Sequence, residues 1–160
     1  MTSSNIVGGR PGRLFFGGGT LTTTGNYLGD GTDIGPGTIN GTVIEGPGGV
    51  IEPGGTTGVG ILTINGSLIL QAGASVEIGV GAQGFATLTV NGNASLAGLL
   101  TVSLLGGFVP DPDAPDEFQV ITYTTYDGSF DNSTIDLGSG LQFLVDVGDA
   151  AVTLVTQRIT

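Results

Sequence analysis

The chain has 160 residues, with 14 acidic and three basic side chains and a formal net charge of −11 at pH 7. It contains no Cys, His or Lys. Their absence excludes disulfides, thiolate metal sites and the catalytic mechanisms that need a His, Cys or Lys. The shortage of cations also argues against nucleic-acid partners and anionic membrane surfaces.

The composition favours an all-β domain. Glycine supplies 32 residues and proline seven, but 39% of the chain is hydrophobic, which is more than disordered sequences carry. Glycine is unfavourable inside helices, whereas the abundant Thr, Val and Ile prefer strands. We therefore expect many short strands joined by glycine-rich turns.

Residues 1–36 are glycine-rich and irregular, and we expect an N-terminal arm or capping segment there. A short apolar cluster in this segment follows two of the three cations. It could cover the open end of the core or dock on a neighbouring copy, where the cations would meet an acidic surface. The candidate assembly residues are Arg10, Arg13, Leu14, Phe15 and Phe16.

Residues 37–105 contain a repeat. Leu62–Gly66 reads Leu-Thr-Ile-Asn-Gly and recurs one period later as Leu88–Gly92, and Thr38–Gly41 is an earlier partial copy. A period in the twenties indicates a stacked repeat unit. Alternating apolar residues predict strands at Ile61–Ile64, Ser67–Leu70, Val76–Val80, Ala86–Val90, Ala94–Leu96 and Leu99–Leu105.

Two folds fit this repeat. Asn-Gly between strands is a hairpin signal, which would give an antiparallel β-sandwich. Alternatively, each Asn-Gly is a corner of a β-solenoid with about four or five parallel coils. We favour the solenoid because it would stack Asn40, Asn65 and Asn91 in a ladder of side-chain amide hydrogen bonds. A second, buried column would hold Val50, Val76 and Val102.

Residues 106–160 are expected to form a C-terminal antiparallel cap. Phe118–Tyr123 predicts a strand, and Leu141–Val147 with Ala151–Thr156 predicts a hairpin around a two-residue type II′ turn at Gly148–Asp149. Aromatic side chains that could cover the last coil are concentrated here, at Phe108, Phe118, Tyr123, Tyr126, Phe130 and Phe143.

Several segments resemble the passengers of autotransporters and related bacterial surface proteins. The similar stretches are Pro53–Gly58, Ile61–Leu68, Leu99–Leu104, Gly107–Pro110, Phe118–Tyr123 and Gly128–Asp131. The resemblance spans roughly residues 37–156 and implies a right-handed parallel β-helix. The acidic, proline-rich Asp111–Glu117 departs from the short glycine-containing turn usual in that family.

Because mechanisms that need His, Cys or Lys are excluded, a pair of carboxylates is the one set of catalytic groups that the composition still allows. The grouped acids, Asp111, Asp113, Asp116 and Glu117, lie in a proline-rich loop, whereas catalytic carboxylates need rigid, partly desolvated positions. Acids within the repeat are scarce, namely Glu45, Glu52 and Glu77. We therefore predict no enzyme and no cofactor, and we regard the four loop acids as weak calcium candidates.

Threonines in the repeat raise the alternative of a flat face for ice or crystalline polysaccharide. Thr63 and Thr89 alternate with apolar residues, however, as outward β-formers ordinarily do. We expect a non-catalytic structural protein that associates with itself or with other structural proteins of one assembly, such as a fibre, surface layer or virion. The alternative is an adhesin-like fragment that binds a glycan or host surface.

The expected location is extracellular, at a cell surface or in a virion, although no signal peptide is readable in this chain. No segment approaches the roughly 20 apolar residues that span a bilayer, so no membrane insertion is expected.

Overall fold

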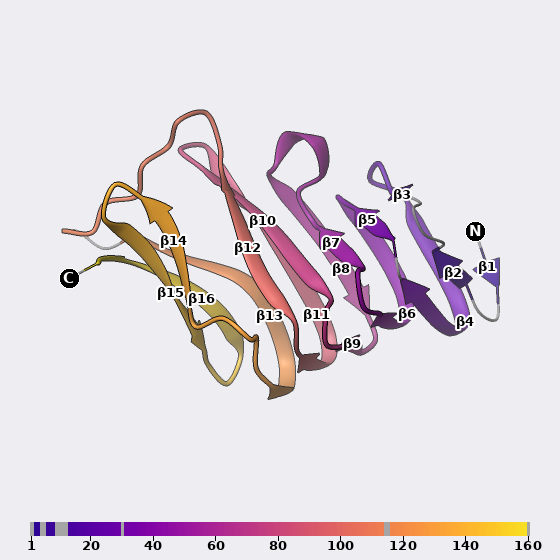
Figure 1. Cartoon of the computed structure of the whole chain (residues 1–160). Coiled ribbons are helices and arrows are strands. Elements are labelled where there is room, and N and C mark those ends of the chain that lie inside the picture. The colour runs from indigo at the N-terminus through magenta and orange to yellow at the C-terminus, as the bar shows by residue number, and fades with distance from the viewer. Residues whose placement is uncertain (1, 4–5, 9–12, 30, 114–115, 160) are drawn as a thin grey trace.

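The computed structural model describes residues 2–3, 6–8, 13–29, 31–113 and 116–159. The predicted all-β class is confirmed, because these residues form strands joined by turns and one short 3-10 turn, η1 (Gly55–Thr57). The two ends of the chain lie at opposite ends of the molecule (Figure 1).

The chain returns repeatedly to the same two rows of strands, and within each row neighbours pair in parallel. The first row contains β1 (Thr2–Ser3), β2 (Ile6–Gly8), β4 (Thr20–Gly29), β6 (Gly37–Glu45), β8 (Gly60–Asn65), β9 (Leu68–Leu70), β11 (Gly84–Leu96) and β13 (Glu117–Gly128). The second row contains β3 (Arg13–Phe15), β5 (Thr32–Ile34), β7 (Val50–Glu52), β10 (Ser75–Gly81) and β12 (Leu99–Leu104).

Several expected boundaries shift. The parallel rows begin before residue 37, since β4 and β5 already belong to them. The two strands expected at Ala86–Val90 and Ala94–Leu96 are one continuous strand, β11. The regular pairing therefore extends into the segment that the sequence indicated as an irregular arm.

The space between the two rows is filled by alternate side chains of each strand. In the second row, Ile51, Val76 and Leu100 are paired neighbours and all three are buried. The predicted column of Val50, Val76 and Val102 is therefore wrong, because Val50 pairs with Ser75 and Val102 pairs with Ile78. The step along the chain from Val76 to Leu100 is shorter than the step from Ile51 to Val76, so the period is not constant.

The Asn-Gly pairs lie where the strands of the first row turn a corner, and the corners stack on one another. A methyl group on Gly92 would lie 2.5 Å from the carbonyl oxygen of Gly66, and one on Gly66 would collide with the carbonyl oxygen of Gly41. Such close backbone approach requires glycine at each successive corner.

The C-terminal region differs from the expected cap. β13 pairs in parallel with β11 along most of its length, so residues 117–128 extend the first row. Only β14 (Thr134–Gly138), β15 (Leu141–Val147) and β16 (Ala151–Arg158) are antiparallel additions, with β16 also pairing antiparallel with β13. The predicted hairpin is confirmed as β15–β16, but its turn is displaced by one residue. Val147 pairs with Val152, and the Gly148 amide donates a 2.8 Å hydrogen bond to the Ala151 carbonyl, which leaves Asp149 and Ala150 at the tip.

Aromatic rings close this end of the core. Phe118 packs edge-to-face against Phe85, Phe108 and Phe143, with centroid distances of 5.3, 6.3 and 5.8 Å. Phe143 is fully buried, and Phe130 is nearly so. These large side chains shield the end of the core from solvent.

Candidate functional site

The outward side chains of the first row form columns that run across the strands. Asn65 donates a 2.7 Å hydrogen bond to Asn40, and Asn91 donates one of 2.7 Å to Asn65. Asn40 in turn donates to the hydroxyl of Thr22, at 3.2 Å. The asparagines singled out in the sequence thus lie in one hydrogen-bonded ladder across four strands.

A second column of threonines runs beside this ladder. Thr20 pairs with Thr38, Thr38 with Thr63, Thr63 with Thr89 and Thr89 with Thr122. Among the described residues, no hydrogen bond engages the hydroxyls of these five threonines. We call the two columns together, Thr20, Thr38, Thr63, Thr89 and Thr122 with Thr22, Asn40, Asn65 and Asn91, the Thr/Asn face. Only two of its five aligned threonines, Thr63 and Thr89, were assigned to a face from the sequence.

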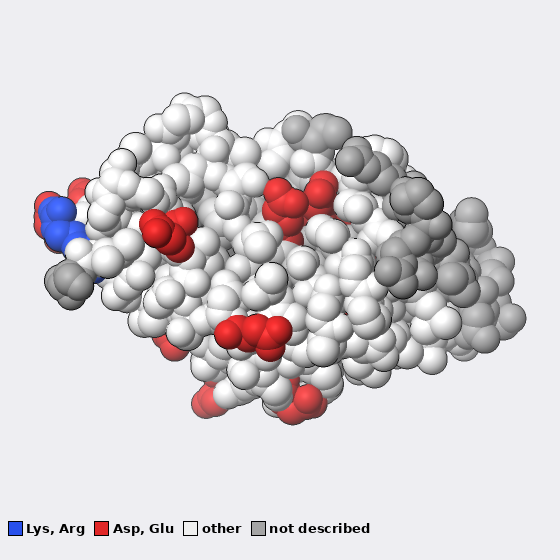
Figure 2. Space-filling model, viewed as in Figure 1, with Lys and Arg blue, Asp and Glu red and all other residues white. Residues whose placement is uncertain are grey.

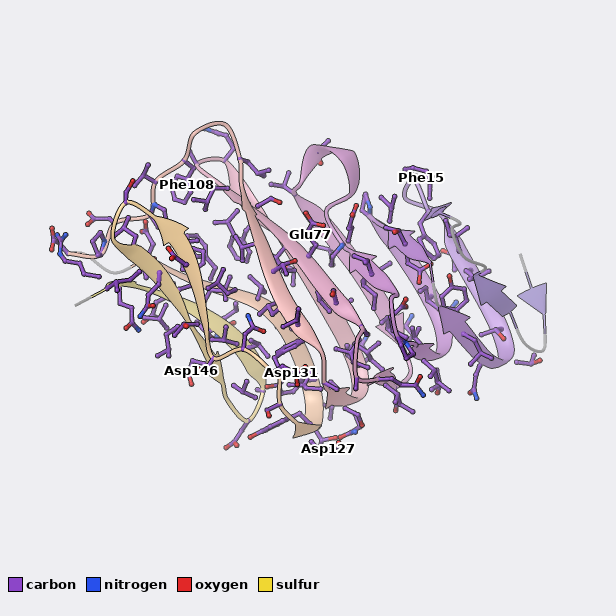
Figure 3. The ribbon with its side chains drawn as sticks, in the orientation of Figure 1. Phe15, Glu77, Phe108, Asp127, Asp131 and Asp146 are labelled. Atoms are coloured by element: carbon purple, nitrogen blue, oxygen red, sulfur yellow. The ribbon has the colours of Figure 1, made fainter. Side chains whose placement is uncertain are left out.

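The second row carries a hollow of about 170 Å³. Its lining includes Glu52 from β7, Glu77 from β10 and Ser103 from β12, and the Ser103 hydroxyl donates a 2.9 Å hydrogen bond to Glu77. Figure 3 places Glu77 near the middle of the molecule, between Phe108 on the C-terminal side and Phe15 on the N-terminal side.

Glycines give this hollow its shape. A methyl group on Gly79 would collide with the backbone of Gly58, and one on Gly58 would lie 2.7 Å from the side chain of Leu105. The loop after β7 can therefore lie directly against β10 only because Gly79 lacks a side chain, and Gly58 leaves room for Leu105 beyond the end of β12.

The hollow offers hydrogen-bond acceptors on Glu52 and Glu77 and a hydroxyl on Ser103. Such groups suit ligands that carry hydroxyl or ammonium donors. This grouping was not predicted from the sequence. Glu77 pairs with Thr101 and Ser103 pairs with Gly79, so the Ser103 hydroxyl reaches Glu77 diagonally and the contact does not follow from a constant period.

The acidic loop that was considered for calcium is instead bound to the end of β16. Asp113 forms a 2.6 Å ion pair with Arg158, and Asp111 accepts a hydrogen bond from the backbone of Asp113. The carboxylate of Asp116 accepts from the backbone of Asp111. In the described part of the chain, no three acidic side chains converge as a metal site would require.

Figure 2 shows that the visible cation lies at the C-terminal end beside acidic groups, while other acids form separate patches on the viewed face. Arg158 is exposed, and its hydrogen bond to Asp113 raises the pKa of the guanidinium. A pair so open to solvent contributes little to stability.

Two acids are buried in the N-terminal part of the core, which the sequence did not predict. Asp33 lies in β5 and accepts a hydrogen bond from the buried Tyr27 hydroxyl. Glu45 is also fully buried, and a methyl group on Gly29 would collide with its carboxylate and touch that of Asp33. The two acids therefore converge on one glycine.

Tyr123 is a further inward polar group. Its hydroxyl donates a 2.5 Å hydrogen bond to the carbonyl of Gly148. Burial, with the nearby Tyr126, Asp149 and Asp146, raises the pKa of Tyr123 to about 12. The hydroxyl therefore stays neutral and ties β13 to the β15–β16 turn.

The residues predicted for assembly are only partly described. Arg10 lies outside the described residues, and Arg13 is placed in β3 by its backbone. Leu14 and Phe16 pack partly against the core, whereas Phe15 is 57% exposed. Leu14 and Phe16 thus help to cover the core, whereas the ring of Phe15 is exposed to solvent.

No helix in the described residues has the length and apolar character needed to cross a membrane. Comparisons with models of known families, with curated proteins and with solved structures found no match.

Proposed function

We propose that this chain is a non-catalytic structural protein, a short right-handed β-solenoid that assembles with copies of itself or with other structural proteins. The observation that carries the proposal is the parallel, in-register pairing of strands across both rows, held by the asparagine ladder. Repeat stacks of this kind are rigid rods whose ends and faces are available for assembly.

Exposed apolar side chains supply contacts for that assembly. Phe15 stands free at the N-terminal end. Leu28, Ile44 and Ile69 are paired neighbours that point outward along the first row, with Leu28 and Ile69 exposed by 38% and 36%. Apolar groups lined up on the surface of an otherwise acidic protein are typical of interaction sites.

The proposal is tested by native mass spectrometry of the full chain at micromolar concentration. We expect oligomers, and we expect Phe15→Ser to lower their mass. Val109→Ser is the matched control, because Val109 is 67% exposed and adjoins Phe108, which packs on Phe118 of β13 and not near Phe15. A wild-type chain that is monomeric at every concentration would refute assembly. An effect of Val109→Ser equal to that of Phe15→Ser would refute the role of Phe15.

The contribution of the cations is tested separately, by light scattering. If a basic arm docks on an acidic neighbour, Arg10→Glu with Arg13→Glu should weaken the oligomer, and so should deletion of residues 1–19. Unchanged oligomer mass in both variants would show that the N-terminal segment does not contribute to assembly.

A second candidate function, adhesin-like binding of a glycan, is favoured by the hollow at Glu52, Glu77 and Ser103. Carboxylates can accept hydrogen bonds from sugar hydroxyls. Glycan-array binding that Glu77→Gln abolishes, and that the exposed control Glu117→Gln leaves unchanged, would support it. Absence of binding by the wild-type chain would exclude it.

A further inference from the structure

We infer that the Thr/Asn face is a binding surface for ice. The inference is independent of self-assembly, because it concerns a face that neither Phe15 nor the Leu28–Ile44–Ile69 row occupies. It rests on three properties of the side chains on that face: their regular spacing, their rigidity and their lack of charge.

The side chains of the Thr/Asn face are regularly spaced in two directions, across the strands and along them. Neighbouring strands in a sheet are about 4.8 Å apart, and alternate residues along a strand are about 6.7 Å apart. The threonine pairings from β4 to β13 lie in unbroken parts of the register, which shifts only after Thr22 on β4 and after Val90 on β11. The hydrogen-bonded ladder extends the order to the adjacent column from β4 to β11. The face is therefore a grid of small polar groups at fixed intervals.

The grid is rigid before any ligand arrives. Threonine is β-branched and has few χ1 rotamers. Asn65 is fixed by hydrogen bonds at both of its amide atoms, and side-chain ladders of this kind also favour flat sheets. Binding would consequently cost little side-chain entropy.

The grid is also free of charge. The strand segments that carry it, residues 20–24, 37–41, 60–65, 84–91 and 118–124, contain no Asp, Glu, Lys or Arg, although the protein has 14 acids. Threonine presents a hydroxyl and a methyl group at each point, and no described residue occupies the five column hydroxyls. These groups can therefore bond to an uncharged, periodic partner.

Three kinds of partner can be compared for this face: a soluble small molecule, a second copy of the chain and a crystalline surface. A soluble small molecule needs a hollow that encloses it, and the hollow at Glu52, Glu77 and Ser103 lies on the second row, away from the grid. A second copy would need roughly 800 Å² per partner with an apolar centre. The grid extends roughly 19 Å across five strands and is only two columns wide, and its side chains are polar.

A crystalline polysaccharide presents sugar rings that bind best on flat aromatic side chains. Neither column of the grid carries an aromatic residue. Ice presents a periodic array of hydrogen-bonding sites without charge or rings. It is therefore the partner that hydroxyl, methyl and amide groups at regular intervals match.

The test uses the full chain and measures thermal hysteresis and the fraction of protein taken up by slowly growing ice. We expect both to exceed the values of an acidic protein that does not bind ice. Thr63→Tyr with Thr89→Tyr should remove both effects, because two bulky rings would hold the lattice away. Thr134→Tyr is the matched control, since Thr134 is exposed on β14, outside the grid.

Circular dichroism is measured on each variant, and Thr63→Ser with Thr89→Ser provides a milder change if the tyrosine variant does not fold. The serine pair should lower ice uptake, because it removes two methyl groups from the grid. Wild-type values no higher than those of the non-binding protein would overturn the inference. So would equal loss in Thr134→Tyr, or preferential binding to microcrystalline cellulose. Oligomer mass, measured on the same samples, keeps this result separate from the assembly proposal.

Discussion

Asn65 donates a 2.7 Å hydrogen bond to Asn40, which lies on the preceding strand of the same row. It also accepts one of the same length from Asn91. Because one side chain joins three strands, its removal should weaken the pairing of the whole row.

Asn65→Ala should therefore lower the free energy of unfolding by about 1 kcal/mol, the net value of one or two solvent-accessible hydrogen bonds. Urea unfolding followed by circular dichroism measures the change. Gln83→Ala, at an exposed turn outside the ladder, should change it little. In a double-mutant cycle, Asn40→Ala and Asn65→Ala should be non-additive. Strict additivity would mean that the ladder contributes no coupling.

Gly92 tests the close stacking of the corners. Its φ angle is not positive, so an alanine there is opposed by contact with the carbonyl oxygen of Gly66 and not by backbone strain. Gly92→Ala should destabilise the fold by about 2 kcal/mol or more, as overpacking does.

The control for this corner is Gly148→Ala. Gly148 also lacks a positive φ, and its nearest contact for an added methyl group is 3.4 Å away. The melting temperature of the Gly148→Ala variant should stay close to that of the wild-type protein. Equal melting temperatures for the two variants would show that the corners are not tightly stacked.

Asn132 closes the free edge of β12. Its side-chain oxygen accepts a 3.1 Å hydrogen bond from the Leu100 amide, and its side-chain nitrogen donates one of 2.8 Å to the Leu100 carbonyl. Among the described strands, β12 pairs only with β10, so the side chain takes the place of a neighbouring strand.

Asn132→Ala should cost about 1–2 kcal/mol because it removes both hydrogen bonds. Asn132→Asp keeps the acceptor and should cost less near neutral pH. Chemical unfolding measures both variants. An aspartate variant that is less stable than the alanine variant would contradict this role for the amide.

Tyr123 predicts a loss of stability at alkaline pH. Its pKa is about 12 in the folded chain, above the usual tyrosine value of about 10. The unfolded chain therefore loses the proton first, and the contribution of the neutral hydroxyl is present below about pH 10 and disappears as pH rises through about 12.

Tyr123→Phe should remove this alkaline decrease, while losing the hydrogen bond to Gly148 at neutral pH. Unfolding midpoints measured across the alkaline range compare the two proteins. The same slope in both would show that Tyr123 does not cause the decrease.

Much of the fold was predictable because parallel stacking repeats residue types at nearly fixed offsets. Asn40, Asn65 and Asn91 follow this rule, and they form the ladder. The buried valine column was wrong because turn lengths vary, so that Val76 pairs with Leu100 and not with Val102. A constant period thus predicts the strand pairing of the first row, which holds the asparagines, better than that of the second row.

The C-terminal extension of the stack was hidden for a similar reason. Thr122 pairs with Thr89 at a longer offset than those of the ladder, because the acidic loop between β12 and β13 lengthens this part of the chain. An alternating strand pattern does not reveal whether its partner is parallel or antiparallel. The burial of Asp33 was also unpredictable, since a glycine-rich acidic run ordinarily indicates an exposed turn.

The in-register stack underlies both proposals, and disulfide formation tests it most directly in this cysteine-free chain. Thr63 and Thr89 are direct neighbours on β8 and β11, within the roughly 4.4–6.8 Å Cα separation of disulfides. Thr63→Cys with Thr89→Cys should form an intramolecular disulfide on mild oxidation of dilute protein. Thr63→Cys with Asn91→Cys, displaced by two residues, should not. Cross-linking of the displaced pair in preference to the direct pair, or of neither pair, would contradict the stacked arrangement.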